Sequence, residues 1–137
     1  MKIKKCVILC GGLGTRLLPI SKTISKEFSN INNKPSIYYQ VKEAYESGIK
    51  EIIFVCTKRN INYLKNYFSK DLYLNEIIKN DKEKLKTLKE LNEIIKNIKF
   101  KYCIQEIRGT YGAVYSARKY LKDEYFGLIY CDDLIDS

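Results

Sequence analysis

The glycine-rich segment near the N-terminus constrains this chain more than any other feature. Residues 2–9 include a short β-branched apolar run, which predicts a buried strand. The run leads into three glycines within four positions, followed by two polar residues: Gly11, Gly12, Gly14, Thr15 and Arg16. Glycine adopts positive φ and lets the backbone approach a ligand closely, and successive N–H groups in such a turn bind anions. The segment therefore predicts a loop that lays backbone amides along a phosphate chain.

Two cations accompany the glycines. Arg16 carries a permanently charged planar fork that matches phosphate oxygens, and Lys26 adds a mobile point charge ten residues later. The alternative interpretation is a tight strand-to-helix turn with an ordinary surface arginine. The full pattern G-G-x-G-T-R after a strand, followed by Pro19 and by Ser25-Lys26-Glu27, favours the phosphate-binding loop.

The loop differs from two common glycine fingerprints. A Walker A loop needs G-x-x-x-x-G-K-[ST], and no lysine stands at that offset from Gly11 or Gly12. A dinucleotide-binding loop needs G-x-G-x-x-G, but the residue three after Gly14 is Leu17. The pattern therefore argues against a P-loop kinase and against a dinucleotide-dependent dehydrogenase.

The stretch from Leu9 to Glu27 resembles the signature loop of the sugar-phosphate nucleotidyltransferases, especially of the bacterial members that join UTP to glucose 1-phosphate. Further segments agree with that family in order and spacing: 33–39 (N-K-P-S-I-Y-Y), 44–55 (A-Y-E-S-G-I-K-E-I-I-F-V), Gln105 with 109–114 (G-T-Y-G-A-V), and 125–133 (Y-F-G-L-I-Y-C-D-D). The resemblance extends over essentially all 137 residues. It corresponds to the N-terminal half of such an enzyme.

The resemblance implies a reaction and a site. A phosphate oxygen of glucose 1-phosphate would attack the α-phosphorus of UTP, and pyrophosphate would leave. By resemblance, the catalytic residues are Arg16, beside the leaving pyrophosphate, and Lys26, near the reacting phosphates. The implied nucleotide contacts are Leu9, Gly11, Gly12, Gly14, Thr15, Gln105, Gly109 and Gly112. Mg²⁺ would bridge phosphate oxygens, and the family position makes Asp132 its protein ligand.

Simpler interpretations stay open at two of these positions. Gln105 can present both a donor and an acceptor to a base edge, and the alternative is a surface glutamine at a strand end. For Asp132 the alternative is a solvated acidic turn. Adjacent residues on a strand point to opposite faces, so Asp132 and Asp133 are not both expected to face a metal ion.

Departures from the family pattern leave the base open. The turn at 109–114 lacks the histidine of the more usual G-L-G-H-A-V, and it lies one residue closer to Gln105 than in uridylyltransferases. Ser21 and Ser25 replace a threonine and a proline. The alternatives are therefore a thymidylyl- or cytidylyltransferase, and a non-catalytic nucleotide-binding remnant.

Length and composition fit one globular domain. A chain of 137 residues with 45% hydrophobic content falls within the usual range for a single domain. It has no run of eighteen apolar residues, so no membrane span is expected. The charged and then apolar N-terminus superficially resembles a signal peptide, but the apolar run is short and leads into the glycine loop.

The cysteines point to a reducing compartment. The five cysteines are odd in number and include no C-x-x-C, and the chain has no histidine. We therefore expect buried free thiols in the cytoplasm and no cysteine metal site.

The net charge of +9 permits a nucleic-acid partner. The lysines between residues 79 and 101 are interspersed with glutamates and form no unbroken basic stripe. Solvated lysine-rich helix faces explain this pattern, and the positive charge would help to steer an anionic nucleotide. We expect no nucleic-acid partner, and we leave a homo-oligomer open.

The chain alternates strands and helices. The expected strands are 2–9, 51–56, 98–104 and 125–131; the expected helices are 35–47, 60–68, 71–97 and 112–121; a glycine loop and an irregular segment extend to about residue 33. This order predicts an α/β fold with a Rossmann-like, doubly wound and mainly parallel sheet. Ligands bind beyond the carboxyl ends of such strands, where the glycine loop, Gln105 and Asp132 converge.

Two further expectations concern the helical region and the domain. Apolar residues recur at helical spacing along one face, which we interpret as core packing; the alternative is a groove for a partner. They are Leu85, Leu88, Leu91, Ile94, Ile95 and Ile98. We expect residues 1–137 to form a nucleotide-binding portion, ending after the fourth strand and lacking a sugar-binding C-terminal portion.

Overall fold

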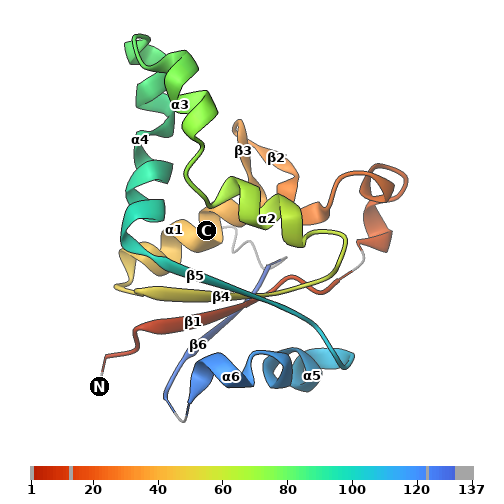
Figure 1. Cartoon of the computed structure of the whole chain (residues 1–137). Helices are drawn as coiled ribbons and strands as arrows, with labels where there is room; N and C mark the ends of the chain where they lie inside the picture. The colour runs from red at the N-terminus through yellow and green to blue at the C-terminus, as the bar shows by residue number, and fades with distance from the viewer. Residues whose placement is uncertain (1, 13, 123, 132–137) are drawn as a thin grey trace.

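The computed structural model describes residues 2–12, 14–122 and 124–131. Its centre is a parallel sheet of four strands: β1 Lys5–Leu9, β4 Glu51–Cys56, β5 Lys99–Ile104 and β6 Gly127–Tyr130. The strands lie in the order β5-β4-β1-β6 (Figure 1). The predicted α/β class with a parallel sheet is confirmed.

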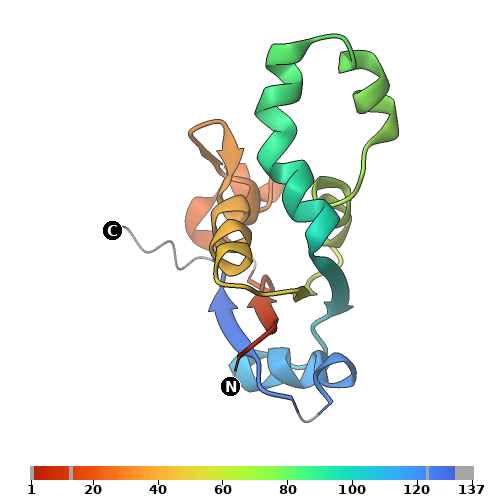
Figure 2. The same cartoon turned by 90° about the vertical axis from the view of Figure 1, so that its left-hand side faces the viewer.

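Helices cover both faces of this sheet. They are α1 Ser36–Glu46, α2 Ile61–Tyr67 and α4 Lys82–Asn97 on one face, and α5 Gly109–Ser116 and α6 Arg118–Leu121 on the other (Figures 1 and 2). Cys6 and Ile8 of β1 pack into the first core, and Val7 and Leu9 pack into the second. Strands buried on both sides have nearly continuous apolar sequences, which explains why β1 and β4 are recognisable in the sequence.

Strand β1 lies at the point where the chain reverses the direction in which it adds strands to the sheet. The chain proceeds outward from β1 to β4 and β5, and then returns to the opposite side of β1 as β6. Ligands of doubly wound sheets bind at this reversal, outside the carboxyl ends of the strands. The glycine loop leaves the carboxyl end of β1 and therefore lies at that position.

The segment between β1 and α1 has more structure than the sequence indicates. It contains three short 3₁₀ helices, η1 Thr15–Leu17, η2 Ile20–Lys22 and η3 Lys26–Phe28, and a hairpin of β2 Asn30–Ile31 and β3 Lys34–Pro35. Asn32 and Asn33 form the hairpin turn with φ of 51° and 65°. Two-residue turns with positive φ match the twist of a hairpin, and asparagine tolerates that conformation.

Several predicted boundaries are corrected. The helical stretch 71–97 is two helices, α3 Leu72–Ile78 and α4, which together form an arm that extends away from the sheet (Figures 1 and 2). An aspartate caps the start of each: the Asp71 carboxylate accepts from Leu74 N at 3.0 Å, and that of Asp81 accepts from Lys84 N at 3.1 Å. The helix expected at 112–121 begins at Gly109 and divides into α5 and α6.

The first strand is also shorter than expected. Strand β1 begins at Lys5, where pairing with Glu51 of β4 starts, and residues 2–4 are exposed.

The apolar face of α4 packs as core from Leu88 onward, whereas Leu85 is exposed on the arm. Gly48 ends α1 as predicted, with φ of 93°.

The cysteines behave as expected. All five are free and buried. Burial raises the pKa of the Cys10 thiol well above its usual value, so this cysteine stays protonated next to the glycine loop.

Among the described residues, no helix is both long and apolar enough to cross a membrane.

Candidate nucleotide-binding site

The carboxyl ends of β1, β5 and β6 meet around a cavity of about 270 Å³. Its lining residues are Leu9, Gly11, Gly12, Lys26, Gln105, Gly109, Thr110, Ala113, Tyr130 and Cys131. The first six of these residues are ones for which the sequence predicts a role in catalysis or nucleotide binding. The other four lie in the expected turn and strand segments but were not assigned a role. Segments far apart in the sequence thus meet at the edge where the fold predicts a ligand.

Of the remaining expected residues, those that the structure describes do not line this cavity. Thr15 and Arg16 lie in η1, further along the loop, and Gly14 precedes them. Gly112 is buried inside α5. Asp132 lies outside the described residues; it directly follows Cys131, which does line the cavity.

Two glycines of the loop allow a close approach by side chains from elsewhere. A Cβ atom on Gly11 would lie 1.8 Å from Gln105 Oε1, and a Cβ atom on Gly12 would lie 2.7 Å from Lys26 Nζ. Any larger residue at either position would displace the side chain that faces it. The bare backbone here brings an amide acceptor and an ammonium group onto one short stretch of loop.

Gly14 serves a different purpose from Gly11 and Gly12. Its φ of 66° lies in the left-handed region, which glycine enters without steric cost. Its carbonyl accepts a hydrogen bond from the buried Ser21 hydroxyl at 2.6 Å. This bond closes the loop on itself between Gly14 and η2.

The orientation of the Gln105 amide is fixed by its surroundings. Its Nε2 donates to Ile107 O at 2.8 Å and to Gly109 O at 3.3 Å. Because a carbonyl oxygen can only accept, the nitrogen must face these two groups and Oε1 must face Gly11. Within the described residues Oε1 forms no hydrogen bond, so the cavity presents an acceptor at this point.

The position of Lys26 depends on its neighbour Glu27, which is fully buried. The Glu27 carboxylate accepts hydrogen bonds from the Ser25 hydroxyl, from Asn60 Nδ2 at 3.4 Å and from Cys131 Sγ at 3.5 Å. A buried carboxylate is tolerated only where such partners satisfy it. Glu27 thus connects the Lys26 segment to the end of β6 and to the start of α2.

Asn60 is a structural residue of the site that sequence reasoning missed. Its Nδ2 also donates to Cys10 O at 2.7 Å, and its Oδ1 accepts from Thr57 N at 3.0 Å. The side chain therefore holds the ends of β1 and β4 together beneath the glycine loop. The sequence marks Asn60 only as a residue at a helix start; nothing local indicates its partners.

Gln40 plays a comparable role at β6. This buried residue of α1 donates from Nε2 to Cys131 O at 2.7 Å, directly before Asp132. On the cavity side, the hydroxyls of Thr110 and Tyr130 hydrogen bond to each other at 3.1 Å. Both contacts fix the carboxyl end of β6 against its surroundings.

Among the described residues, no group of three or more potential ligands could hold a metal ion.

Replacing Glu27 with alanine is expected to destabilise the chain by about 1–3 kcal/mol, because Asn60 and Cys131 lose a buried acceptor. Urea unfolding measures the effect. The control is Glu76→Ala on α3, an exposed carboxylate whose removal should change stability by less than about 0.5 kcal/mol. Equal unfolding free energies for the two variants would contradict the anchoring role of Glu27.

A glycine loop and a second glycine-containing turn, which meet at the reversal of a doubly wound sheet, define a class of nucleotide-handling proteins. The chain belongs to the nucleotidyl transferase family, whose sequence model matches residues 5–137. The match spans the strands, the glycine loop and the turn that carries Gln105.

Relatives within the family have more specific names. The chain is 37% identical over 137 residues to UTP–glucose-1-phosphate uridylyltransferase 2 of Staphylococcus saprophyticus, covering 99% of this chain and 47% of the relative. It is 39% identical over 134 residues to the UTP–glucose-1-phosphate uridylyltransferase of Pseudomonas aeruginosa, covering 96% and 47%. The chain thus spans about half the length of these relatives.

Solved structures agree with these sequence relatives. An apo UDP-glucose pyrophosphorylase superposes with a TM-score of 0.88 at 36% identity, covering 96% of this chain and 48% of that one. A UTP-bound enzyme from Acinetobacter baumannii gives a TM-score of 0.84 at 33% identity, covering 95% and 46%. The resemblance to the family expected from the motifs is confirmed.

Proposed function

We propose that this chain is the nucleotide-binding portion of a UTP–glucose-1-phosphate uridylyltransferase, which forms UDP-glucose and pyrophosphate from UTP and glucose 1-phosphate. The observation that carries the proposal is the single cavity in which Gly11, Gly12, Lys26 and Gln105 meet. The named relatives and the UTP-bound neighbour support the choice of substrates. Residues beyond this portion would supply most contacts to the sugar.

The Gln105 amide supports a preference among pyrimidine bases. Its Oε1 is the group turned toward Gly11 and the cavity, because Ile107 O and Gly109 O hold its nitrogen. Uracil and thymine carry an N–H at N3 that donates to such an acceptor, whereas cytosine has a bare acceptor nitrogen there. Two facing acceptors cannot form a hydrogen bond. The geometry thus favours UTP or dTTP over CTP, and the relatives favour UTP.

The cations supply the charge that the reaction needs. Nucleotidyl transfer depends mostly on positioning and on stabilising phosphate charge. Lys26, above Gly12, would contact the phosphates near the reacting centre, and the exposed Arg16 would close on the leaving pyrophosphate. Mg²⁺ would be held by Asp132 together with phosphate oxygens, and it would lower the cost of charge on the leaving group.

The expected location belongs to the same proposal. Free thiols persist in reducing compartments, so the five buried cysteines support a cytoplasmic location.

Two alternative functions stay open. The Gln105 geometry also permits a thymidylyltransferase, because thymine has the same N–H at N3. A nucleotide-binding chain without catalysis is the second alternative, and it would release no pyrophosphate with any sugar phosphate.

Calorimetric titration tests the nucleotide site, after circular dichroism establishes that each sample is folded. Lys26→Ala and Arg16→Ala should each weaken UTP binding about tenfold or more, because each removes a charge-assisted contact to phosphate. Lys86→Ala, which removes an exposed lysine on α4, should bind UTP like the parent. If Lys26→Ala and Arg16→Ala also bind like the parent, the assigned site is wrong.

The same titration with dTTP, CTP, ATP and GTP tests the base. We expect UTP to bind more tightly than CTP, and Gln105→Ala to reduce that difference. Equal affinity of the parent for UTP and CTP would contradict the role given to Gln105.

A further inference from the structure

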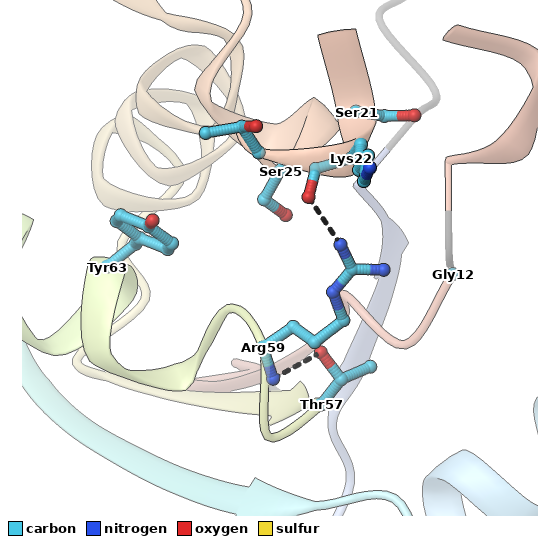
Figure 3. Close-up of a pocket in the computed structure, with 8 residues that line it drawn as sticks. Gly12, Ser21, Lys22, Ser25, Thr57, Arg59 and Tyr63 are labelled. Carbon is cyan, nitrogen blue, oxygen red and sulfur yellow. Dashed lines mark hydrogen bonds between the residues drawn. The ribbon is translucent and has the colours of Figure 1, made fainter. Parts of the chain in front are cut away.

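A second cavity lies on the other side of Gly12, with a volume of about 380 Å³ (Figure 3). It is lined by Gly12, Ser21, Lys22, Thr23, Ser25, Thr57, Arg59 and Tyr63. In the figure, Arg59 reaches from the loop after β4 to the backbone of Lys22, with Tyr63 and Ser25 to one side and Gly12 to the other. The cavity thus lies between the glycine-loop segment and the start of α2. The signature segment supplies five of its eight lining residues, but nothing in the sequence indicates that Arg59 joins them.

The chemistry of this cavity suits an anion. Its lining carries two cations, Lys22 and Arg59, and several hydroxyls, and none of the described residues that line it has a carboxylate. Guanidinium, ammonium, hydroxyl and backbone N–H groups are the donors that phosphate oxygens accept from. A neutral sugar would not need two cations, whereas a phosphate group would.

Arg59 is held ready for such a ligand. Its Nη2 donates to Lys22 O at 2.6 Å, and its backbone N donates to Thr57 Oγ1 at 3.2 Å. These bonds hold both ends of the residue while most of the five N–H donors of the guanidinium form no hydrogen bond within the described residues. A fixed arginine loses less conformational freedom when it binds than a mobile one does.

The cavity adjoins the candidate nucleotide site at one shared residue. Gly12 lines both cavities, and Lys26 Nζ lies directly against it. A nucleotide whose base lies at Gln105 would direct its phosphates along the loop toward Gly12. The phosphates furthest from the base would then reach the side of Gly12 that Arg59 and Lys22 face.

We propose that this second cavity is a diphosphate subsite, in which Arg59 and Lys22 hold the β- and γ-phosphates of the bound nucleotide and then the pyrophosphate formed from them. The proposal rests on the proposed function and extends it. During the reaction the sugar-phosphate oxygen bonds to the α-phosphorus, and the bond from that phosphorus to the bridging oxygen of the β-phosphate breaks. Pyrophosphate keeps the bridging oxygen and its electron pair, and the subsite already surrounds it with positive charge.

The test separates the phosphate end of the nucleotide from the base end. Inorganic pyrophosphate, UTP and UMP are titrated into the parent chain, Arg59→Ala, Lys22→Ala and the control Lys86→Ala. Arg59→Ala should weaken pyrophosphate and UTP binding about tenfold, the loss typical of one charge-assisted contact, and leave UMP binding unchanged. Lys22→Ala should act in the same direction while keeping the carbonyl that anchors Arg59.

The outcomes also separate this proposal from the proposed function. The subsite is refuted if the folded parent does not bind pyrophosphate, if Arg59→Ala binds it like the parent, or if UMP and UTP weaken equally. If pyrophosphate binding depends on Arg59 while Gln105→Ala leaves UMP and UTP binding unchanged, the subsite stands and the base site is wrong.

Discussion

Replacing Gly112 with alanine is expected to disrupt the Gln105 side of the candidate site and to destabilise the fold around it. A Cβ atom there would lie 2.0 Å from Ile107 O and 2.5 Å from Ile107 C. These are backbone atoms, so relief requires movement of the chain and not of a flexible side chain. Overpacking of this kind costs about 1–3 kcal/mol. The same Ile107 carbonyl accepts from Gln105 Nε2, so its displacement releases the residue that we propose to face the base.

Thermal unfolding and UTP titration check this prediction together. Gly127→Ala is the matched control, because a Cβ atom there would meet Cys6 Sγ at 3.7 Å, an ordinary contact. We expect Gly112→Ala to lower the melting temperature and to weaken UTP binding, and Gly127→Ala to change both little. A Gly112→Ala protein with the melting temperature and UTP affinity of the parent would contradict the argument.

The features readable from the sequence are those with a local cause. Strands β1 and β4 are apolar runs because both of their faces are buried, and Gly48 ends α1 because it adopts positive φ. The order of these elements leaves few ways to connect them in a parallel sheet. The sequence alone therefore suffices to place the glycine loop and Gln105 at one edge of the sheet.

The parts that sequence reasoning missed depend on contacts between distant residues. Asn60 and Glu27 are 33 positions apart and meet only because β1, β4 and η3 end at the same place. Arg59 and Lys22 are 37 positions apart, and their cavity exists only in the folded chain. The division between α3 and α4 is a different case, because Asp81 before Lys82 is a readable N-cap signal.

Replacing Phe54 with alanine is expected to have the largest effect on stability. Phe54 is fully buried in β4 and stacks on three rings, with centroid separations of 5.4 Å to Phe68, 5.9 Å to Phe100 and 5.6 Å to Tyr102. Truncating a buried phenylalanine to alanine costs about 3–5 kcal/mol. Folded domains are stable by about 5–15 kcal/mol in total, so this change should unfold a large fraction of the chain or leave it marginal.

Chemical denaturation of Phe54→Ala beside Phe54→Leu measures the effect. Leucine keeps most of the apolar volume, so its cost should stay below that of alanine, at about 1.5 kcal/mol. The two variants also test how the site depends on the core, because Gln105 N donates to Cys56 O at 2.9 Å, two residues after Phe54. We expect Phe54→Leu to retain UTP binding and Phe54→Ala to lose it in proportion to the unfolded fraction. Equal stability of the two variants would show that the aromatic stack contributes little, and that the helices on this face hold the sheet without it.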